Sequence, residues 1–529
     1  MARSFHESGE FKVFGALFDI PTVLYSIFIS PVFVSSSMGN AYWLAKALGA
    51  LMMCAVVFPA YALAREILDT RNAFAAAVLS VAIPGVCYTS TVMAENPFYP
   101  TFVLCFWLCF RVLVRFRARD AILAGVITSA AFFVKIQAAI LLAGFLLALL
   151  LLVGYQIVHV SRASLRVLRQ VMALGLGICA IFITIAWIVR GRGSFMGSTY
   201  SAILRFDSLI PPLGATGTAL IITTVAMIAG TGGIMLALVG STKIDWSSPF
   251  SEPKSAMTTF GSCVAILFFG VVVRHTVLID GSLRAHERYL FVLAPILFIL
   301  WLARDKLVPP FELAIQFIVG AGLIVAASFY GWNRILTFNT PTDSPSLSYV
   351  FYIFLMHTMS NFGIGVLLFV LITLMILIGA WQRKHPMMAV SSLLIIFVIL
   401  NLGWYHLQSK IIRPEVAGFS TFAEELHREL RPESTVAFLS DSLDIRVVWY
   451  STFWLPNPTL TVAIDTTPPW WGHKVSRDLL TGEIEFIGPR PALIVAANTI
   501  KLPYPVVFEN PVAGVRAYRI TVVPQSKPQ

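Results

Sequence analysis

The stretch FGIGVLLFVLITLMILIGA, residues 362–380, runs for 19 residues without a charged side chain. A bilayer has a hydrocarbon core about 30 Å thick, and an α-helix needs about 20 apolar residues to cross it. Four more stretches have a similar length and at most one charged residue: 73–93, 170–189, 216–239 and 311–330. The sequence therefore predicts a polytopic α-helical membrane protein.

The composition agrees with this prediction. Of the 529 residues, 57% are hydrophobic and 12% are charged, whereas soluble domains contain about 25% charged residues. The formal net charge is +11, but from Lys410 onward twelve basic and twelve acidic residues cancel. The whole excess therefore belongs to loops of the membrane part, and it does not indicate a nucleic-acid partner.

About twelve membrane-spanning helices are expected, so the lipid bilayer is the first predicted partner. The expected spans are 42–64, 73–92, 98–114, 121–135, 137–156, 170–189, 216–239, 257–278, 289–303, 311–330, 350–380 and 387–405. Basic residues concentrate in alternate short loops, such as 111–119, and such loops lie on the cytoplasmic side. The chain is accordingly predicted to be a multi-pass protein of the plasma (inner) membrane.

Residues 1–41 are expected to form a first outer loop with interfacial helices, followed by a transmembrane domain at 42–405. Residues 14–34 are apolar but contain two prolines, and proline removes helical hydrogen bonds, so a broken interfacial segment is favoured over a clean span. Twelve spans leave both ends outside, yet residues 1–13 carry no signal-peptide pattern. A preceding helix that this sequence lacks would explain both observations; the alternative is a further span at 14–34.

Residues 406–529 are expected to form an extracytoplasmic α/β domain, which would be periplasmic in a Gram-negative cell. About 120 residues suffice for one small domain. A helix is predicted at 419–430, and turn residues such as proline and glycine separate the short β-type runs. The predicted strands are 435–439, 446–450, 459–464, 492–496, 506–509 and 515–522.

Two acidic features lie on the predicted outer face. Glu7 and Glu10 precede an apolar segment, and they are either part of a solvated N-terminal stub or carboxylates of a site. Glu95 lies in a turn so short that it must sit at the membrane surface beside helix ends. A lone loop glutamate is usually only solvated, so both interpretations stay open for Glu95.

Two basic features are expected on the same face. Lys135 interrupts an apolar run, and it either snorkels outward or provides a counter-charge for a phosphate. His286, Arg288 and Tyr289 begin a predicted span and are either interfacial anchors or part of a phosphate site, since arginine recognises phosphate in a bidentate manner. Acidic and basic sites on one face suit transfer from a lipid phosphate: cations neutralise the leaving phosphate, and a carboxylate deprotonates the acceptor hydroxyl.

In their order along the chain, these motifs resemble those of the GT-C glycosyltransferases, which include protein O-mannosyltransferases and lipid A aminoarabinose transferases. ESGEF at 7–11 resembles the acidic motif of the first outer loop, and ENPF at 95–98 the acidic second-loop motif. VKIQ at 134–137 resembles the lysine motif, and ERYL at 287–290 the Arg-Tyr segment. The resemblance implies about thirteen helices and a polyprenyl-phosphate-linked sugar donor. The leading aspartate of the family falls on a glutamate here, and the next acidic residue falls on a serine.

We therefore expect a membrane glycosyltransferase that moves one sugar from a polyprenyl phosphate to an acceptor hydroxyl of a glycan, lipid or protein. Glu7 or Glu10 would be the general base, and Glu95 would orient the acceptor or help to bind a cation. No cofactor is certain, and a divalent cation stays open. The donor phosphate would be held by Lys135, His286, Arg288 and Tyr289.

The alternatives are a transporter or flippase of lipid-linked sugars and a structural subunit with a sensory outer domain. A transporter is expected to carry charges near the bilayer midplane and to have related halves. Most charges of this chain lie instead at the ends of the predicted spans.

Overall fold

The computed structural model of the chain describes most of its residues. They are residues 1–13, 16–17, 21–35, 37–158, 164–190, 213–238, 252–277, 285–304, 309–336, 340–357, 360–382, 384–428, 430, 434–443, 448, 455, 459–464, 473–477, 483–486, 490–511 and 514–520. They form two compact units. The smaller comprises Met1–Phe18, Ser26–Trp43 and Gln408–Gln529, and the larger Asp19–Tyr25 and Leu44–Leu407.

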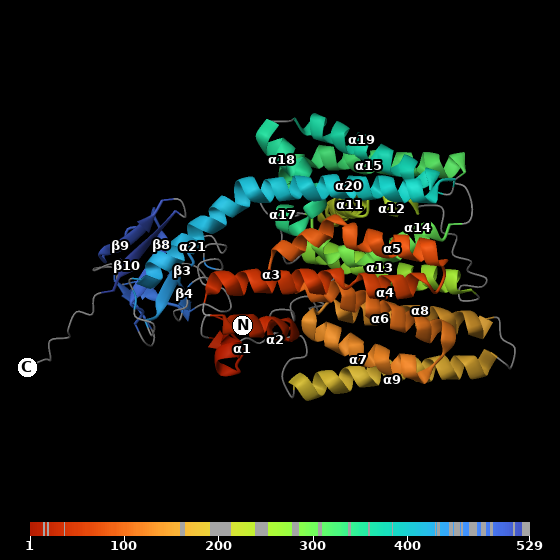
Figure 1. The fold of residues 1–529 in the computed structure, drawn as a ribbon, viewed down its shortest axis with the longest axis horizontal. Helices are drawn as coiled ribbons and strands as arrows, with labels where there is room; N and C mark the ends of the chain where they lie inside the picture. The colour runs from red at the N-terminus through yellow and green to blue at the C-terminus, as the bar shows by residue number, and fades with distance from the viewer. Residues whose placement is uncertain are drawn as a thin grey trace, which may run out of the picture. The chain divides into compact units, whose positions relative to one another are not determined.

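The larger unit is built almost entirely of helices, and its long helices run along a shared direction (Figure 1). They are α3 (Met38–Cys54, which begins in the smaller unit), α4 (Val57–Ala64), α5 (Thr70–Ala82), α6 (Glu95–Arg115), α7 (Ala118–Val134), α8 (Ala138–Val158), α9 (Ser164–Arg190), α11 (Leu213–Gly230), α12 (Ile234–Ala237), α13 (Pro253–His275), α14 (Ala294–Leu302), α15 (Pro310–Tyr330), α16 (Trp332–Ile335), α17 (Thr340–Asp343), α18 (Ser348–His357), α19 (Asn361–Trp381) and α20 (Pro386–Leu407). Short 3₁₀ turns join them, including η2 (Pro84–Ser90), η6 (Glu287–Tyr289), η7 (Phe291–Leu293) and η8 (Pro345–Leu347).

Among the described residues, eight helices are long and apolar enough to cross a bilayer, or nine if the bent pair of α5 and η2 counts as one span. The helical membrane fold is therefore confirmed, but the expected count of twelve spans is not. Several predicted spans are interrupted. The span predicted at 73–92 bends by 49° between α5 and η2, where Pro84 lacks the N–H that a continuing helix needs.

Three other predicted spans are also broken. The span at 216–239 divides at Gly232 and Gly233, whose φ angles of 60° and 75° lie in the left-handed region that favours glycine. The span at 289–303 begins with 3₁₀ turns before α14. The span at 350–380 is wrong, because α18 and α19 are separate helices. The Ser360 side chain caps α19 by accepting a hydrogen bond from the Gly363 N–H, as N-cap serines do.

Close packing holds the helices of the larger unit together. Phe106 of α6 stacks on Phe260 of α13 with 4.2 Å between ring centroids. A Cβ built on Gly144 of α8 would lie 2.6 Å from Val264 Cγ2 of α13. The missing side chain therefore lets these two helices approach closely, as small residues do between membrane helices.

The smaller unit contains the N-terminal helix α1 (Ala2–Ser8) and a C-terminal α/β domain. The described elements of this domain include helix α21 (Arg413–Arg428) and a six-stranded sheet of order β5-β4-β3-β8-β10-β9. Its strands are β3 (Val436–Leu439), β4 (Thr459–Ala463), β5 (His473–Lys474), β8 (Leu493–Ala497), β9 (Val506–Asn510) and β10 (Val515–Arg519). The first four pair in parallel, and β8, β10 and β9 pair antiparallel.

The secondary structure predicted for this domain is confirmed for the helix and for five of the six strands. The helix begins earlier than predicted, at Arg413. The strand predicted at 446–450 lies outside the described residues except for Val448, which is not in a strand. The described part of 14–34 holds strand β2 (Ala16–Leu17) and the short helices α2 (Leu24–Ile29) and η1 (Ser30–Val34), in agreement with a broken segment.

Candidate functional site

A buried ion pair joins two of the predicted site residues. Glu95 is the first residue of α6, where a carboxylate interacts favourably with the helix dipole. Lys135 follows the last residue of α7, and its extended backbone ends that helix. Lys135 Nζ lies 2.6 Å from Glu95 Oε1, and the two residues are only 9% and 5% exposed. Lys135 therefore does not snorkel to solvent; it faces protein groups.

Arg288 and Tyr289 of η6 lie beside this pair. Lys135 Nζ is 5.1 Å from the centroid of the Tyr289 ring, and the Arg288 guanidinium carbon is 4.8 Å from it. The guanidinium also donates a hydrogen bond of 2.8 Å to the Tyr289 hydroxyl. Its Nε lies 3.4 Å from Oδ1 of Asp343 at the end of α17. Two cations and two carboxylates thus lie close together around one aromatic ring.

All of these groups except Asp343 line a cavity of about 500 Å³. Its polar lining includes Glu95, Lys135, His275, Arg288 and Tyr289. Its apolar lining comes from α8 and α13, which lead away from the polar residues because α8 begins just after Lys135 and α13 ends at His275. The apolar residues include Ile140, Ala143, Leu267 and Val271. The cavity therefore combines a charged region with an apolar region.

His286 does not line this cavity. It is fully buried, and its ring centroid lies 5.4 Å from those of His275 and Tyr289. Its Nδ1 lies 4.0 Å from Asp343 Oδ1. His286 therefore lies behind Tyr289, where it supports the site by packing and not by direct exposure to the cavity.

Hydrogen bonds fasten residues 285–289 to residues 344–346. The Glu287 N–H donates to Ser344 Oγ at 3.3 Å, and the Ser344 hydroxyl donates to Ala285 O at 3.1 Å. The hydroxyl and the N–H of Ser346 both donate to Glu287 Oε2. We call this set of contacts the polar clamp. It fixes the backbone on both sides of the Arg288–Asp343 ion pair.

The Glu287 carboxyl lies outside the helices that could span a bilayer and is 1% exposed. Burial raises the pKa of Glu287 to about 8, because a carboxylate loses solvation inside the protein. Its Oε1 has no hydrogen-bond partner among the described residues. A Cβ built on Gly230 would lie 2.7 Å from this oxygen, so the backbone of α11 closes the space around the carboxyl.

Glu7 and Glu10 belong to the smaller unit, whereas the cavity belongs to the larger one. Glu7 lies in α1 and is exposed, with its Oε1 3.6 Å from Arg3 Nε. Glu10 pairs with Lys12. Arg3 also donates a hydrogen bond of 2.9 Å to Leu455 O, which joins α1 to the C-terminal domain of the same unit.

The structure thus brings four of the seven predicted site residues into one cavity lining: Glu95, Lys135, Arg288 and Tyr289. Sequence reasoning missed Asp343 and His275, and it missed the serines of the polar clamp. The described residues hold no group of three or more His, Cys, Asp and Glu side chains that could bind a metal ion. Glu95, the predicted cation ligand, is ion-paired with Lys135.

Comparisons with known proteins give two matches. Residues 28–189 match the family described as dolichyl-phosphate-mannose-protein mannosyltransferase. The whole chain superposes on 93% of ArnT from Cupriavidus metallidurans, solved in a crystal structure bound to undecaprenyl phosphate, with a TM-score of 0.56 and 16% sequence identity. The chain has a GT-C fold. The search of curated proteins gave no match. At this identity the likeness to ArnT establishes the GT-C fold, which agrees with the resemblance found in the four motifs.

Proposed function

We propose that this chain is a GT-C glycosyltransferase that moves one sugar from a polyprenyl-phosphate carrier to an acceptor hydroxyl on the extracytoplasmic face of the membrane. The observation that carries the proposal is the cavity, in which Lys135 and Arg288 lie next to an apolar lining. A polyprenyl phosphate needs both parts: cations for the phosphate and apolar surface for the lipid chain. The ArnT structure contains undecaprenyl phosphate, which supports a donor of this chemical class.

The charges of the site suggest how the donor phosphate binds. Lys135 is paired with Glu95 and Arg288 with Asp343, so the four charges balance when the site is empty. A phosphate that binds Lys135 must compete with Glu95 for the ammonium group. In this proposal the donor loosens the Lys135–Glu95 pair, and Glu95 then becomes available to orient the acceptor. The Tyr289 hydroxyl, held by Arg288, provides a further donor to the phosphate.

The general base in this proposal is Glu7 or Glu10, which would take the proton of the acceptor hydroxyl as the sugar is transferred. Both carboxylates are exposed, as a group that must meet an incoming acceptor has to be. The Arg3–Leu455 hydrogen bond ties this N-terminal segment to the C-terminal domain. That contact supports a shared role for the two parts in acceptor recognition.

Sugar transfer in detergent tests the proposal. The purified full chain is mixed with a sugar-loaded polyprenyl phosphate and a detergent extract of cell-envelope acceptors. The expected result is acceptor-dependent loss of the sugar from the lipid. A transporter or flippase has no membrane to act across under these conditions, so an unchanged donor would favour that alternative.

A further inference from the structure

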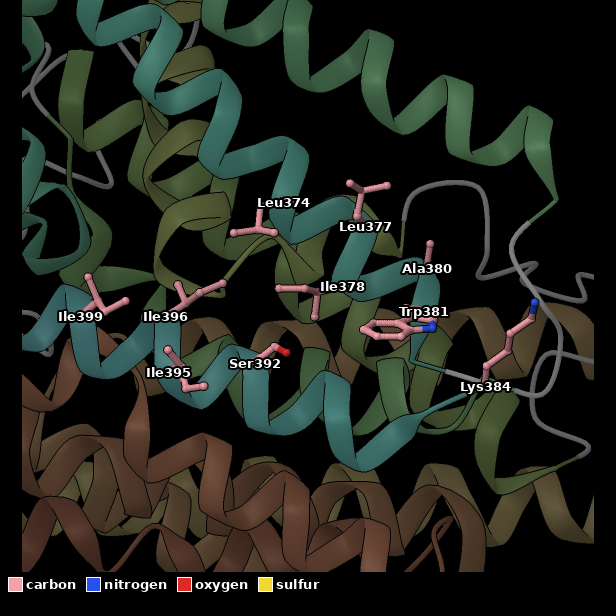
Figure 2. A pocket seen from close by; sticks show the side chains of 10 residues that line it. All are labelled: Leu374, Leu377, Ile378, Ala380, Trp381, Lys384, Ser392, Ile395, Ile396 and Ile399. Carbon is pink, nitrogen blue, oxygen red and sulfur yellow. The ribbon is translucent and has the colours of Figure 1, made fainter.

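A second and larger cavity, of about 820 Å³, lies between α19 and α20 (Figure 2). We call it the α19/α20 groove. All but two of its lining residues are hydrophobic; the exceptions are Ser392 and Lys384. Lys384 is exposed and lies in the short connection between the two helices. The groove is therefore apolar along its length and positively charged at one end.

The groove begins near the connection and follows both helices away from it. Its lining reaches Ile399 on α20, which begins at Pro386, and Leu374 on α19, which ends at Trp381. On α20 the lining runs from Ser392 to Ile399, which is about 10 Å at a rise of about 1.5 Å per residue. One leaflet occupies about half of a hydrocarbon core that is about 30 Å thick. The groove is therefore short enough to lie within a single leaflet, alongside part of a lipid chain.

Several residues along the groove are exposed at the surface of the larger unit, including Leu374, Leu377, Ile395 and Ile399. Both α19 and α20 are apolar enough to span the bilayer, so this face meets lipid and not water. Trp381, at the same end as Lys384, is a residue type that favours the membrane interface. The surroundings thus supply a site for an amphiphile: a chain in the groove and a head group at Lys384.

We infer that the α19/α20 groove is a binding site for an anionic phospholipid, with an acyl chain along the groove and the head group at Lys384. Apolar packing alone gives little preference in a bilayer, because lipid tails are as apolar as the side chains they contact. The charge at the groove end therefore supplies the selectivity. The site shares none of its lining residues with the Glu95–Lys135 cavity.

Lipid titration of the purified full chain in a neutral detergent, followed by native mass spectrometry, tests this inference. Phosphatidylglycerol and phosphatidylcholine with identical acyl chains serve as probes. We expect about fivefold tighter binding of phosphatidylglycerol, the factor set by one lysine near an anionic lipid. Lys384→Gln should abolish this preference, and Lys384→Arg should keep it.

Filling the groove tests whether the acyl chain of the lipid lies there. Ser392→Trp should weaken the binding of both lipids by about tenfold, because overpacking removes the room for an acyl chain. Ser391→Trp is the matched control, since Ser391 is exposed on the same helix and does not line the groove. Thermal unfolding verifies that each variant is folded, and Ser392→Leu replaces Ser392→Trp if the larger residue prevents folding.

Two outcomes would overturn the inference. Equal affinity of the wild type for the two phospholipids would exclude a charge-selective site at Lys384. Equal effects of the substitutions at Ser391 and Ser392 would place the lipid elsewhere. If sugar-free polyprenyl phosphate alone displaced both phospholipids from the wild type but not from the Ser392 variant, the groove would belong to the donor and not to bilayer lipid.

Discussion

Replacing Glu287 by Gln should stabilise the protein at neutral pH. The pKa of this buried carboxyl is raised from 4.5 to about 8. At about 1.36 kcal/mol per pKa unit, ionising the carboxyl in the folded protein is therefore about 5 kcal/mol less favourable than in the unfolded chain. At pH 7 the unfolded chain has already lost the proton while the folded chain keeps it. This difference in protonation at pH 7 therefore lowers the free energy of unfolding by about 3 kcal/mol. An uncharged amide of similar shape removes that cost.

The sign of the pH dependence follows from the raised pKa. Below pH 4.5 the carboxyl is protonated in both states and contributes no difference. Between pH 4.5 and about 8 only the unfolded chain releases the proton, so stability falls as the pH rises. Above about pH 8 both states are ionised, and the dependence ends. Glu287→Gln should lack this slope.

Thermal unfolding in detergent at pH 5, 7 and 8.5 measures this effect. We expect a higher Tm for Glu287→Gln than for the wild type at pH 7, and a lower Tm for Glu287→Ala, which leaves the two Ser346 donors without an acceptor. As an independent perturbation, Gly230→Ala should press a methyl group against the carboxyl and destabilise the protein by about 1–3 kcal/mol. Gly217→Ala is its control, since nothing lies within 4 Å of that added atom.

The same titration should affect sugar transfer. Ionisation above about pH 8 would place a negative charge on Glu287, the residue that precedes Arg288, and near Cys87 and Tyr88. Donor KM should therefore rise above pH 8 in the wild type and stay flat in Glu287→Gln. A Glu287→Gln protein that is less stable than the wild type at pH 7, with an unchanged pH slope, would refute the reasoning.

Three further predictions address the proposed mechanism and topology. Lys135→Gln should destabilise the protein by about 3–5 kcal/mol, because it leaves Glu95 buried without its cation. The double variant Lys135→Gln with Glu95→Gln should restore Tm but not donor KM. An unchanged donor KM in the double variant would exclude Lys135 as a phosphate ligand. Glu7→Gln should lower kcat by about 10²–10⁴ and largely keep donor KM, with Glu10→Gln as the comparison; full activity in both would remove the first loop from the mechanism. A reporter fused to the C-terminus should give an extracytoplasmic signal, and a cytoplasmic signal would contradict the proposed topology.

The fold class could be predicted from the sequence because long uncharged runs leave few alternatives to membrane helices. The boundaries of the helices were harder to predict, because a proline or an N-cap residue within an apolar run ends or bends a helix without changing the hydropathy of the run. The bend at Pro84 and the start of α19 after Ser360 are examples. Ser360 is a residue type that favours N-caps, so the sequence did contain a signal for dividing 350–380.

Part of the candidate site was predictable from the sequence, namely the charges that interrupt apolar runs. Glu95 and Lys135 stood out in this way, and they form a buried pair. Asp343 did not stand out, because an aspartate in a polar loop is normally solvated. Its role depends on tertiary packing that brings α17 against η6, where it meets Arg288. Nothing in the sequence distinguishes the serines of the polar clamp from other loop serines until their partner, Glu287, is known to be buried.

The most direct test of the central claim is the fate of the donor lipid in the presence of purified wild type and Arg288→Gln protein, compared at equal amounts of monodisperse chain. A sugar-loaded polyprenyl phosphate and envelope acceptors are incubated in detergent, and the lipid products are identified by mass spectrometry. We predict that the wild type releases free polyprenyl phosphate, and that Arg288→Gln releases it at least about tenfold more slowly at low donor concentration, since a hydrogen bond to a charged group contributes about 1.5–3 kcal/mol. An unchanged donor in the wild-type reaction, or equal rates for the two proteins, would contradict the account.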